Sequence, residues 1–250
     1  MSGHSKWATT KHQKAAKDKS RGKLFAKLIR QIEVAAREGG PDIDGNPTLR
    51  TAVGKARDAS VPVDTIEKAI KRGSGNLEGA KYEAINYEGY APCGVAVFVE
   101  TLSDNRNRTG AEVRNIFSKN GGTPAEPGAV AWQFNRMGSI LVPRAAGEED
   151  EIMLVAADAG AEDLVDLGER WQVLTPPTDL HTVRSALESA GLPVESGDLV
   201  MQPSTTVALD DEGDVRKVLR LIEALEDHDD VQNVYANFDV SDDVLEALAV

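Results

Sequence analysis

The chain has 250 residues, 41% of them hydrophobic and 28% charged, which is enough apolar sequence for real cores and excludes wholesale disorder. No apolar run reaches the roughly 18 residues of a membrane-spanning helix, and the N-terminus lacks the apolar stretch of a secretory signal. The single cysteine, Cys93, excludes an internal disulfide framework and a multi-cysteine zinc site, so we expect a reducing compartment, the cytoplasm.

Charge is divided unevenly along the chain. The net charge of −13, taken alone, argues against a nucleic-acid partner. Residues 1–75, however, contain 16 Lys and Arg against 8 Asp and Glu, whereas residues 76–250 contain 12 against 33. This division is typical of a basic segment that binds a polyanion and is attached to an acidic body, so phosphate contacts should lie toward the N-terminal end.

Residues 1–22 are expected to form a flexible basic arm, because no stripe of large apolar side chains could bury them. Each lysine or arginine that meets a phosphate releases condensed counterions, and Trp7 offers a face on which a base can stack. A solvated tail and a basic, acid-poor mitochondrial transit peptide are the alternatives. We assign nucleic-acid binding here to Lys6, Trp7, Lys11, His12, Lys14, Lys17, Lys19, Arg21 and Lys23.

Residues 23–76 predict a helical domain of three helices. The first, over about residues 23–38, has a broad apolar face and is stopped by a Gly-Gly-Pro sequence. Asn46 is the expected N-cap of the second helix, since it is followed by a proline at the first helical position. The third helix is expected to begin near Pro62 and to end at Gly73.

The rest of the chain alternates strands and helices. Residues 136–202 contain one complete βαββαβ pattern, which is typical of a ferredoxin-like domain. The flanking segments, residues 77–135 and 203–250, each contribute a βαβ unit, and together they give a second copy of the pattern. The outer copy takes residues 129–134 as its second strand, while a further strand at residues 82–87 precedes it.

The predicted fold class is therefore α+β: an N-terminal three-helix domain followed by two ferredoxin-like α+β domains, one inserted in the other. Insertion at an exposed connection is tolerated because closing a longer loop adds little entropy. The alternative is a single continuous α+β domain after the helices.

The titratable side chains form no recognisable catalytic pattern. The four histidines lie in separate segments without the i, i+4 spacing of a helical metal site, and Cys93 has no obvious base nearby. We therefore expect a protein that is not an enzyme and that holds no metal and no cofactor.

The segment from Ser103 to Thr109, which reads SDNRNRT, joins a predicted strand to a helix. Its polar residues can cap the helix, which leaves Arg106 and Arg108 near the positive helix end. Because cations are mildly unfavourable there, stability does not explain these arginines. They form either an anion site that belongs to the nucleic-acid interface or ion pairs with nearby Asp or Glu.

A set of short motifs spread over essentially the whole chain resembles the YebC family. The motifs are Gly3-His-Ser-Lys-Trp7, Lys11-His12, Arg21-Gly-Lys-Leu-Phe25, Asn46-Pro-Thr-Leu49, Val61-Pro62, Ala69-Ile-Lys-Arg-Gly73, Tyr87-Glu-Gly-Tyr90, Asp104-Asn-Arg-Asn-Arg-Thr109 and Asn120-Gly-Gly122. The chain departs from the family pattern at Thr10, Gln13 and Ser103. Gln13 stands where a basic residue is usual, so it weakens the inference for the arm.

The resemblance implies a cytoplasmic protein with a helical N-terminal domain and two α+β domains. Family members are commonly labelled probable transcriptional regulators that bind DNA. Members are also implicated in translation, including the relief of ribosomes stalled on proline-rich stretches, and a mitochondrial relative activates translation. The implied partner is therefore DNA or, in the alternative, ribosomal RNA. The acidic domains could bind the ribosome or a protein, and no membrane is involved.

No predicted helix carries base-reading side chains at a clear spacing, so sequence-specific readout of the major groove is unsupported. A lysine-rich segment on an acidic body suits contact with the backbone of structured RNA at least as well.

Overall fold

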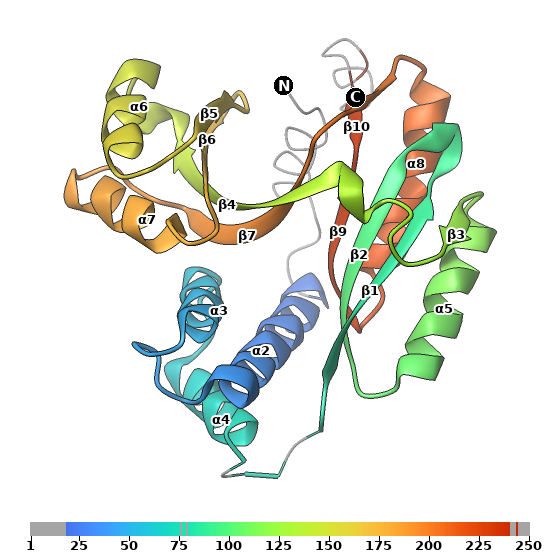
Figure 1. Cartoon of the computed structure of the whole chain (residues 1–250), viewed down its shortest axis with the longest axis horizontal. Coiled ribbons are helices and arrows are strands. Elements are labelled where there is room, and N and C mark those ends of the chain that lie inside the picture. The colour runs from blue at the N-terminus through green and yellow to red at the C-terminus, as the bar shows by residue number, and fades with distance from the viewer. Residues whose placement is uncertain (1–18, 76, 79, 241–243, 245–250) are drawn as a thin grey trace. The chain divides into compact units, whose positions relative to one another are not determined.

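The computed structural model describes residues 19–75, 77–78, 80–240 and 244 (Figure 1). These residues divide into two compact units. Unit 1 comprises residues 24–79 and 136–201, and unit 2 comprises residues 80–135 and 202–250 together with residues 19–23 at the start of the described chain. The α+β class is confirmed. The division into an arm, a helical domain and two α+β domains, one inserted in the other, stays a prediction.

Three helices form the first part of unit 1: α2 (Lys19–Gly39), α3 (Pro47–Asp58) and α4 (Val63–Gly73). All three predicted helices are therefore present. Residues 19–22, which were assigned to the flexible arm, are instead the first turn of α2. Lysine and arginine favour helix, and a helix that is nucleated by packed residues extends at little cost. The packed residues include Leu28, Ile32 and Leu49, which are fully buried.

Asn46 and Gly73 hold these helices together, the first through its side chain and the second because it has none. Asn46 is the N-cap of α3, as predicted, and its side chain accepts from Leu49 N at 3.0 Å. The same side chain donates to the Ala35 carbonyl at 2.8 Å and therefore ties α3 to the end of α2. Gly73 ends α4, where an added Cβ would lie 2.3 Å from the carbonyl oxygen of Glu33. Only glycine permits this close approach of α4 to α2.

The inserted segment of unit 1 has the predicted βαββαβ order. Its elements are β4 (Phe134–Pro143), η3 (Arg144–Ala146), α6 (Glu149–Asp158), β5 (Asp163–Asp166), β6 (Arg170–Thr175), α7 (Leu180–Ser189) and β7 (Ser196–Pro203). The sheet order is β5-β6-β4-β7, so β6 lies between β4 and β5, and β4 lies between β6 and β7. Each βαβ unit is thus split by a strand of the other, as the ferredoxin-like pattern requires.

Unit 2 contains β1 (Glu83–Tyr90), η1 (Pro92–Gly94), β2 (Ala96–Ser103), α5 (Arg106–Lys119), β3 (Thr123–Ala125), η2 (Ala131–Gln133), β8 (Val207–Leu209), α8 (Glu212–Glu226), β9 (Val231–Ala236) and β10 (Phe238–Val240). Its main sheet has the order β3-β1-β2-β9, and β8 pairs in parallel with β10 in a separate two-stranded sheet. In this sheet β1 lies between β3 and β2, at the position where the expected second βαββαβ pattern would place β8.

The predicted strand at residues 129–134 is wrong. Residues 131–133 form a short 3-10 helix, and the sheet edge is instead Thr123–Ala125. The physical reason is Glu88, a buried residue whose carboxylate accepts the N–H groups of Gly128, Val130 and Ala131 at 2.6 to 2.9 Å. Donors that bond to this carboxylate cannot pair with a neighbouring strand.

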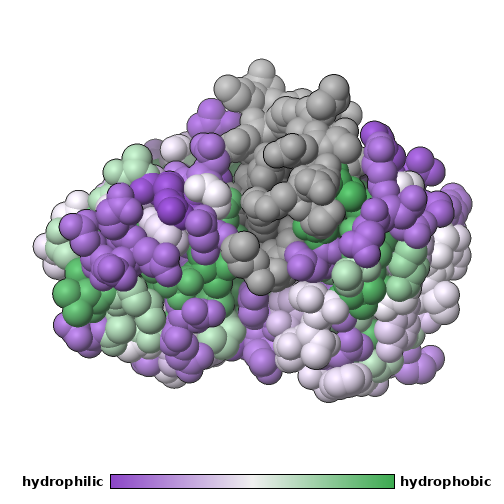
Figure 2. Space-filling model, turned by 90° about the horizontal axis from the view of Figure 1, so that it is seen from above, coloured by the Kyte–Doolittle hydropathy of each residue, from purple (hydrophilic) through white to green (hydrophobic). Residues whose placement is uncertain are grey.

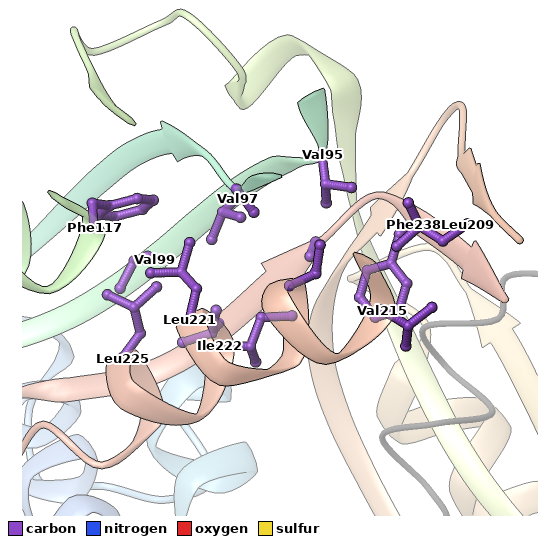
Figure 3. Close-up of a cluster of buried hydrophobic side chains, with 14 of the residues drawn as sticks. Val95, Val97, Val99, Phe117, Leu209, Val215, Leu221, Ile222, Leu225 and Phe238 are labelled. Carbon is purple, nitrogen blue, oxygen red and sulfur yellow. The ribbon is translucent and has the colours of Figure 1, made fainter. Parts of the chain in front are cut away.

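The core of unit 2 lies between one face of its sheet and two helices. Val97 and Val99 of β2, preceded by Val95, face Leu221 and Ile222 of α8 (Figure 3). Phe117 of α5 and Phe238 enclose the same cluster. Both helices thus cover one face of the sheet, which fixes where α5 begins after β2.

The surface is mostly hydrophilic with scattered hydrophobic patches on the face seen in Figure 2. None of the described helices is long and apolar enough to cross a membrane. The large apolar side chains that are exposed lie in separate elements and are Leu24, Val63, Leu77, Trp132 and Leu154.

Replacing Glu88 tests the explanation of residues 126–133. We expect Glu88→Ala to lower the free energy of unfolding by about 2–4 kcal/mol, because it leaves backbone donors without their partner. Glu88→Gln keeps one acceptor oxygen, which can still accept from Val130 and Ala131, so it is expected to lose less. Urea unfolding of both variants measures the difference, and equal stability of Glu88→Ala and the unmodified chain would contradict this role.

Candidate nucleic-acid interface

Most of the predicted arm residues lie outside the described residues: Lys6, Trp7, Lys11, His12, Lys14 and Lys17. Lys19, Arg21 and Lys23 lie in the first turns of α2, where the Arg21 residue is exposed. The basic segment of the sequence is therefore continuous with a helix that is packed into unit 1.

Lys23 has acidic partners. Its ammonium lies 2.6 Å from the Asp227 carboxylate and 3.9 Å from that of Asp229, and it also donates to the Asp227 carbonyl at 3.0 Å. The hydrogen bond to Asp227 is the main cause that raises the pKa of Lys23. A phosphate that binds Lys23 would have to compete with these carboxylates.

The start of α5 is built on a buried polar cluster. Asn105 is the N-cap and accepts from Arg108 N at 3.1 Å. The Asp230 carboxylate, which is buried, accepts from the Thr109 hydroxyl at 2.7 Å, and Thr109 lies 2.6 Å from the Ser103 hydroxyl. The cluster joins the end of β2 to the loop before β9 and leaves the first turn of α5 in a defined position.

Arg108 belongs to this cluster. Its guanidinium lies 2.6 Å from Asp230 and 3.0 Å from Asp104, and the hydrogen bond to Asp230 is the first cause that raises the pKa of Arg108. Of the two interpretations of Arg108, the structure supports the ion pair. Its positive charge is largely compensated and stabilises a buried carboxylate at the positive end of α5.

Arg106 differs from Arg108 although only one residue separates them. It is exposed at the first position of α5, and no carboxylate among the described residues pairs with it. The anion-site interpretation therefore stays open for Arg106. The same helix also carries Arg114, exposed and equally without an ion pair in the described part of the chain. Sequence reasoning missed Arg114, although its position on the same predicted helix was a usable signal.

The helical part of unit 1 adds exposed cations. Arg57 lies in the last turn of α3, and Lys68 and Lys71 lie on α4. All three are exposed, and none has an ion pair to any described residue. Arg72 is different, because its Nε lies 2.5 Å from the buried Glu33 carboxylate. Cations that are not used for internal pairing are available to an anionic partner.

Two of the residues weighed for catalysis belong to different units. His181 lies on α7 in unit 1, whereas Cys93 lies in η1 in unit 2. Cys93 is exposed. Partial desolvation of its thiol, and then a hydrogen bond to Asp214, raise the pKa of Cys93. No group of three His, Cys, Asp or Glu side chains within the described ranges could hold a metal ion.

Comparison with known proteins identifies similar sequences over almost the whole chain. Residues 5–76 match a family model described as the TACO1/YebC protein N-terminal domain, and residues 82–238 match one described as the TACO1/YebC second and third domain. A probable transcriptional regulatory protein of Acidothermus cellulolyticus is 59% identical over 98% of this chain and 99% of its own length. One of Streptomyces coelicolor is 57% identical over 98% of both chains.

A solved structure is also similar. The crystal structure of a conserved hypothetical protein from Aquifex aeolicus has a TM-score of 0.83 and 47% sequence identity, covering 90% of this chain and 93% of that one.

Substitution of the two neighbouring arginines separates their roles. Arg108→Gln is expected to lower the free energy of unfolding by about 1.5–3 kcal/mol, because it removes a charged hydrogen bond from buried Asp230. Arg106→Gln is expected to leave stability unchanged or slightly higher, since a cation is removed from a positive helix end. Urea unfolding measures both, and a larger loss for Arg106→Gln would contradict the assignment.

The reactivity of Cys93 provides a second test. Because its pKa is raised, less thiolate is present at pH 8 than in an unstructured cysteine peptide, so alkylation by iodoacetamide should be slower. Asp214→Asn removes a negative charge that opposes thiolate formation and should increase the rate. Unfolded chain in urea is the reference. A folded chain that reacts as fast as the unfolded one would overturn this environment for Cys93.

Proposed function

The chain belongs to the TACO1/YebC family, and we propose that it is a nucleic-acid-binding regulatory protein of the cytoplasm that performs no catalytic step. The regulatory role follows the names of its relatives, which are probable transcriptional regulatory proteins. The observation that carries nucleic-acid binding is the separation of charge, with 16 Lys and Arg against 8 Asp and Glu in residues 1–75 of a chain whose net charge is −13.

The proposed interface begins with the basic N-terminal segment and the start of α2. The segment supplies several cations in a row, and its affinity for phosphate comes mainly from the release of counterions. Arg57 on α3 and Lys68 and Lys71 on α4 are exposed cations without an ion pair to any described residue, and we propose them as further phosphate contacts. The proposed contacts from the segment are Lys6, Trp7, Lys11, His12, Lys14, Lys17, Lys19, Arg21 and Lys23.

We propose DNA as the partner, in line with the relatives' names, with ribosomal RNA as the second candidate. Ribosomal RNA is favoured by the exposed side chains of α4, which include Glu67, Lys68 and Lys71. These lysines can contact the phosphates of a nucleic-acid backbone, but the exposed residues of α4 include no row of Asn, Gln or Arg side chains that could read base edges. Binding to the backbone of structured RNA requires no such row.

Neutralising arm lysines tests the interface. Lys11→Gln/Lys14→Gln/Lys17→Gln should reduce the slope of log K against log salt by about 2.7 on duplex DNA, or about 2.1 on a single strand, if all three contact phosphate. The control is Arg216→Gln/Lys217→Gln/Arg220→Gln, which removes the same charge from α8. Fluorescence anisotropy at several KCl concentrations gives both slopes, and an unchanged slope in the arm variant refutes the proposed contacts.

Crosslinking in cells followed by sequencing of the attached nucleic acid decides between the partners. Recovery of promoter DNA supports transcriptional regulation, whereas recovery of ribosomal RNA replaces it with action in translation.

A further inference from the structure

Helix α5 carries a cation where its own stability disfavours one. Arg106 is the first residue of the helix, where the helix dipole is positive and a cation is unfavourable. Arg108, close by, is compensated by Asp230 and Asp104. Arg106 has no such compensation from any residue that the structure describes.

The same helix contains a glycine that its backbone does not need. Gly110 is a buried residue inside α5 and has no positive φ. Glycine inside a helix is less favourable than alanine. An added Cβ would lie 3.3 Å from the Tyr87 hydroxyl oxygen and 3.5 Å from a terminal nitrogen of Arg114. The glycine therefore lets Tyr87 and Arg114 lie directly against the helix.

Tyr87 connects the two arginines. Its hydroxyl donates to the carbonyl of Arg106 at 3.3 Å. Burial raises the pKa of Tyr87, whereas the charges of Arg106 and Arg114 lower it. The Tyr87 hydroxyl and a terminal nitrogen of Arg114 both lie beside Gly110. Arg106 and Arg114 are eight residues apart, which corresponds to about 12 Å along the helix axis. Tyr87 lies between them.

This pair of cations lies in acidic surroundings. The segments 80–135 and 202–250 of unit 2 contain 8 Lys and Arg against 19 Asp and Glu. Two of these cations have acidic partners: Arg216 lies 2.5 Å from Glu212, and Lys217 lies 2.8 Å from Asp214. The exposed cations without an ion pair to any described residue are Arg106, Arg114, Lys81, Lys119 and Arg220. Arg106 and Arg114 differ from the other three because both lie on α5 beside Tyr87, so they can act together on one anionic ligand.

We infer that Arg106, Arg114 and Tyr87 form a second contact for the phosphodiester backbone of the nucleic acid. The inference rests on the proposed function. The planar guanidinium binds phosphate through two parallel hydrogen bonds, and two such groups along one helix can hold two phosphates of one strand. Tyr87 fixes the first turn of α5 between them.

The test uses the full chain and the variant Arg106→Gln/Arg114→Gln. The matched control is Arg216→Gln/Arg220→Gln, which removes two charges from α8 of the same unit. One set of anisotropy titrations uses a labelled DNA duplex and a second set uses a labelled RNA hairpin, each over a range of KCl concentrations. The double variant should lose about 1.8 of the salt slope on the duplex, and the control should lose none. The melting temperature of the Arg106→Gln/Arg114→Gln variant should be equal to or above that of the unmodified chain.

The two proposals fail in different ways. If the unmodified chain binds either nucleic acid and the double variant has the same slope and affinity, the second contact is wrong while the proposed function stands. If the unmodified chain binds neither, the proposed function fails, and binding to poly-glutamate in the same assay would assign the arginines to an acidic protein. If the double variant loses salt slope with only one of the two nucleic acids, that nucleic acid is the source of the phosphates.

Discussion

Burial of β2 on both of its faces is the constraint from which the candidate site in unit 2 follows. One face places Val97 and Val99 against α8 and Phe117, and on the other the Phe98 ring lies 6.1 Å from that of Phe134. A strand that is enclosed in this way cannot shift its register without exposing one of its apolar faces. The loop that follows Ser103, and with it the start of α5, therefore has a fixed position.

The fixed start of α5 explains why two arginines in one short motif have different roles. Arg108 is directed to the buried Asp230 carboxylate, where leaving either charge alone would be unfavourable. Arg106 has no such ion pair with any residue that the structure describes. In a chain with 41 acidic residues against 28 basic ones, a cation that remains without a partner keeps its full capacity to bind an anion. Internal pairing thus selects which cations are available for a ligand.

Local sequence signals predicted a large part of this fold. Asn46 before a proline predicted the start of α3, and the alternation of strands and helices predicted the inserted unit, because these patterns depend on neighbouring residues. The apolar residues around Val130 were assigned to a strand because nothing nearby indicates that Glu88, about 40 positions earlier, binds their N–H groups. The pairing of Arg108 with Asp230 spans 122 positions and was open for the same reason. The Tyr87, Gly110 and Arg114 grouping likewise requires β1 and α5 to be placed in space.

We propose that the cations gathered in the N-terminal part of the sequence hold the nucleic acid. The most direct measurement compares the full chain with one that begins at Lys19, using the nucleic acid recovered by crosslinking, at several salt concentrations. The account predicts that the shortened chain keeps its fold and loses most of its affinity and most of its salt dependence. Full affinity and an unaltered salt dependence in the shortened chain would contradict it.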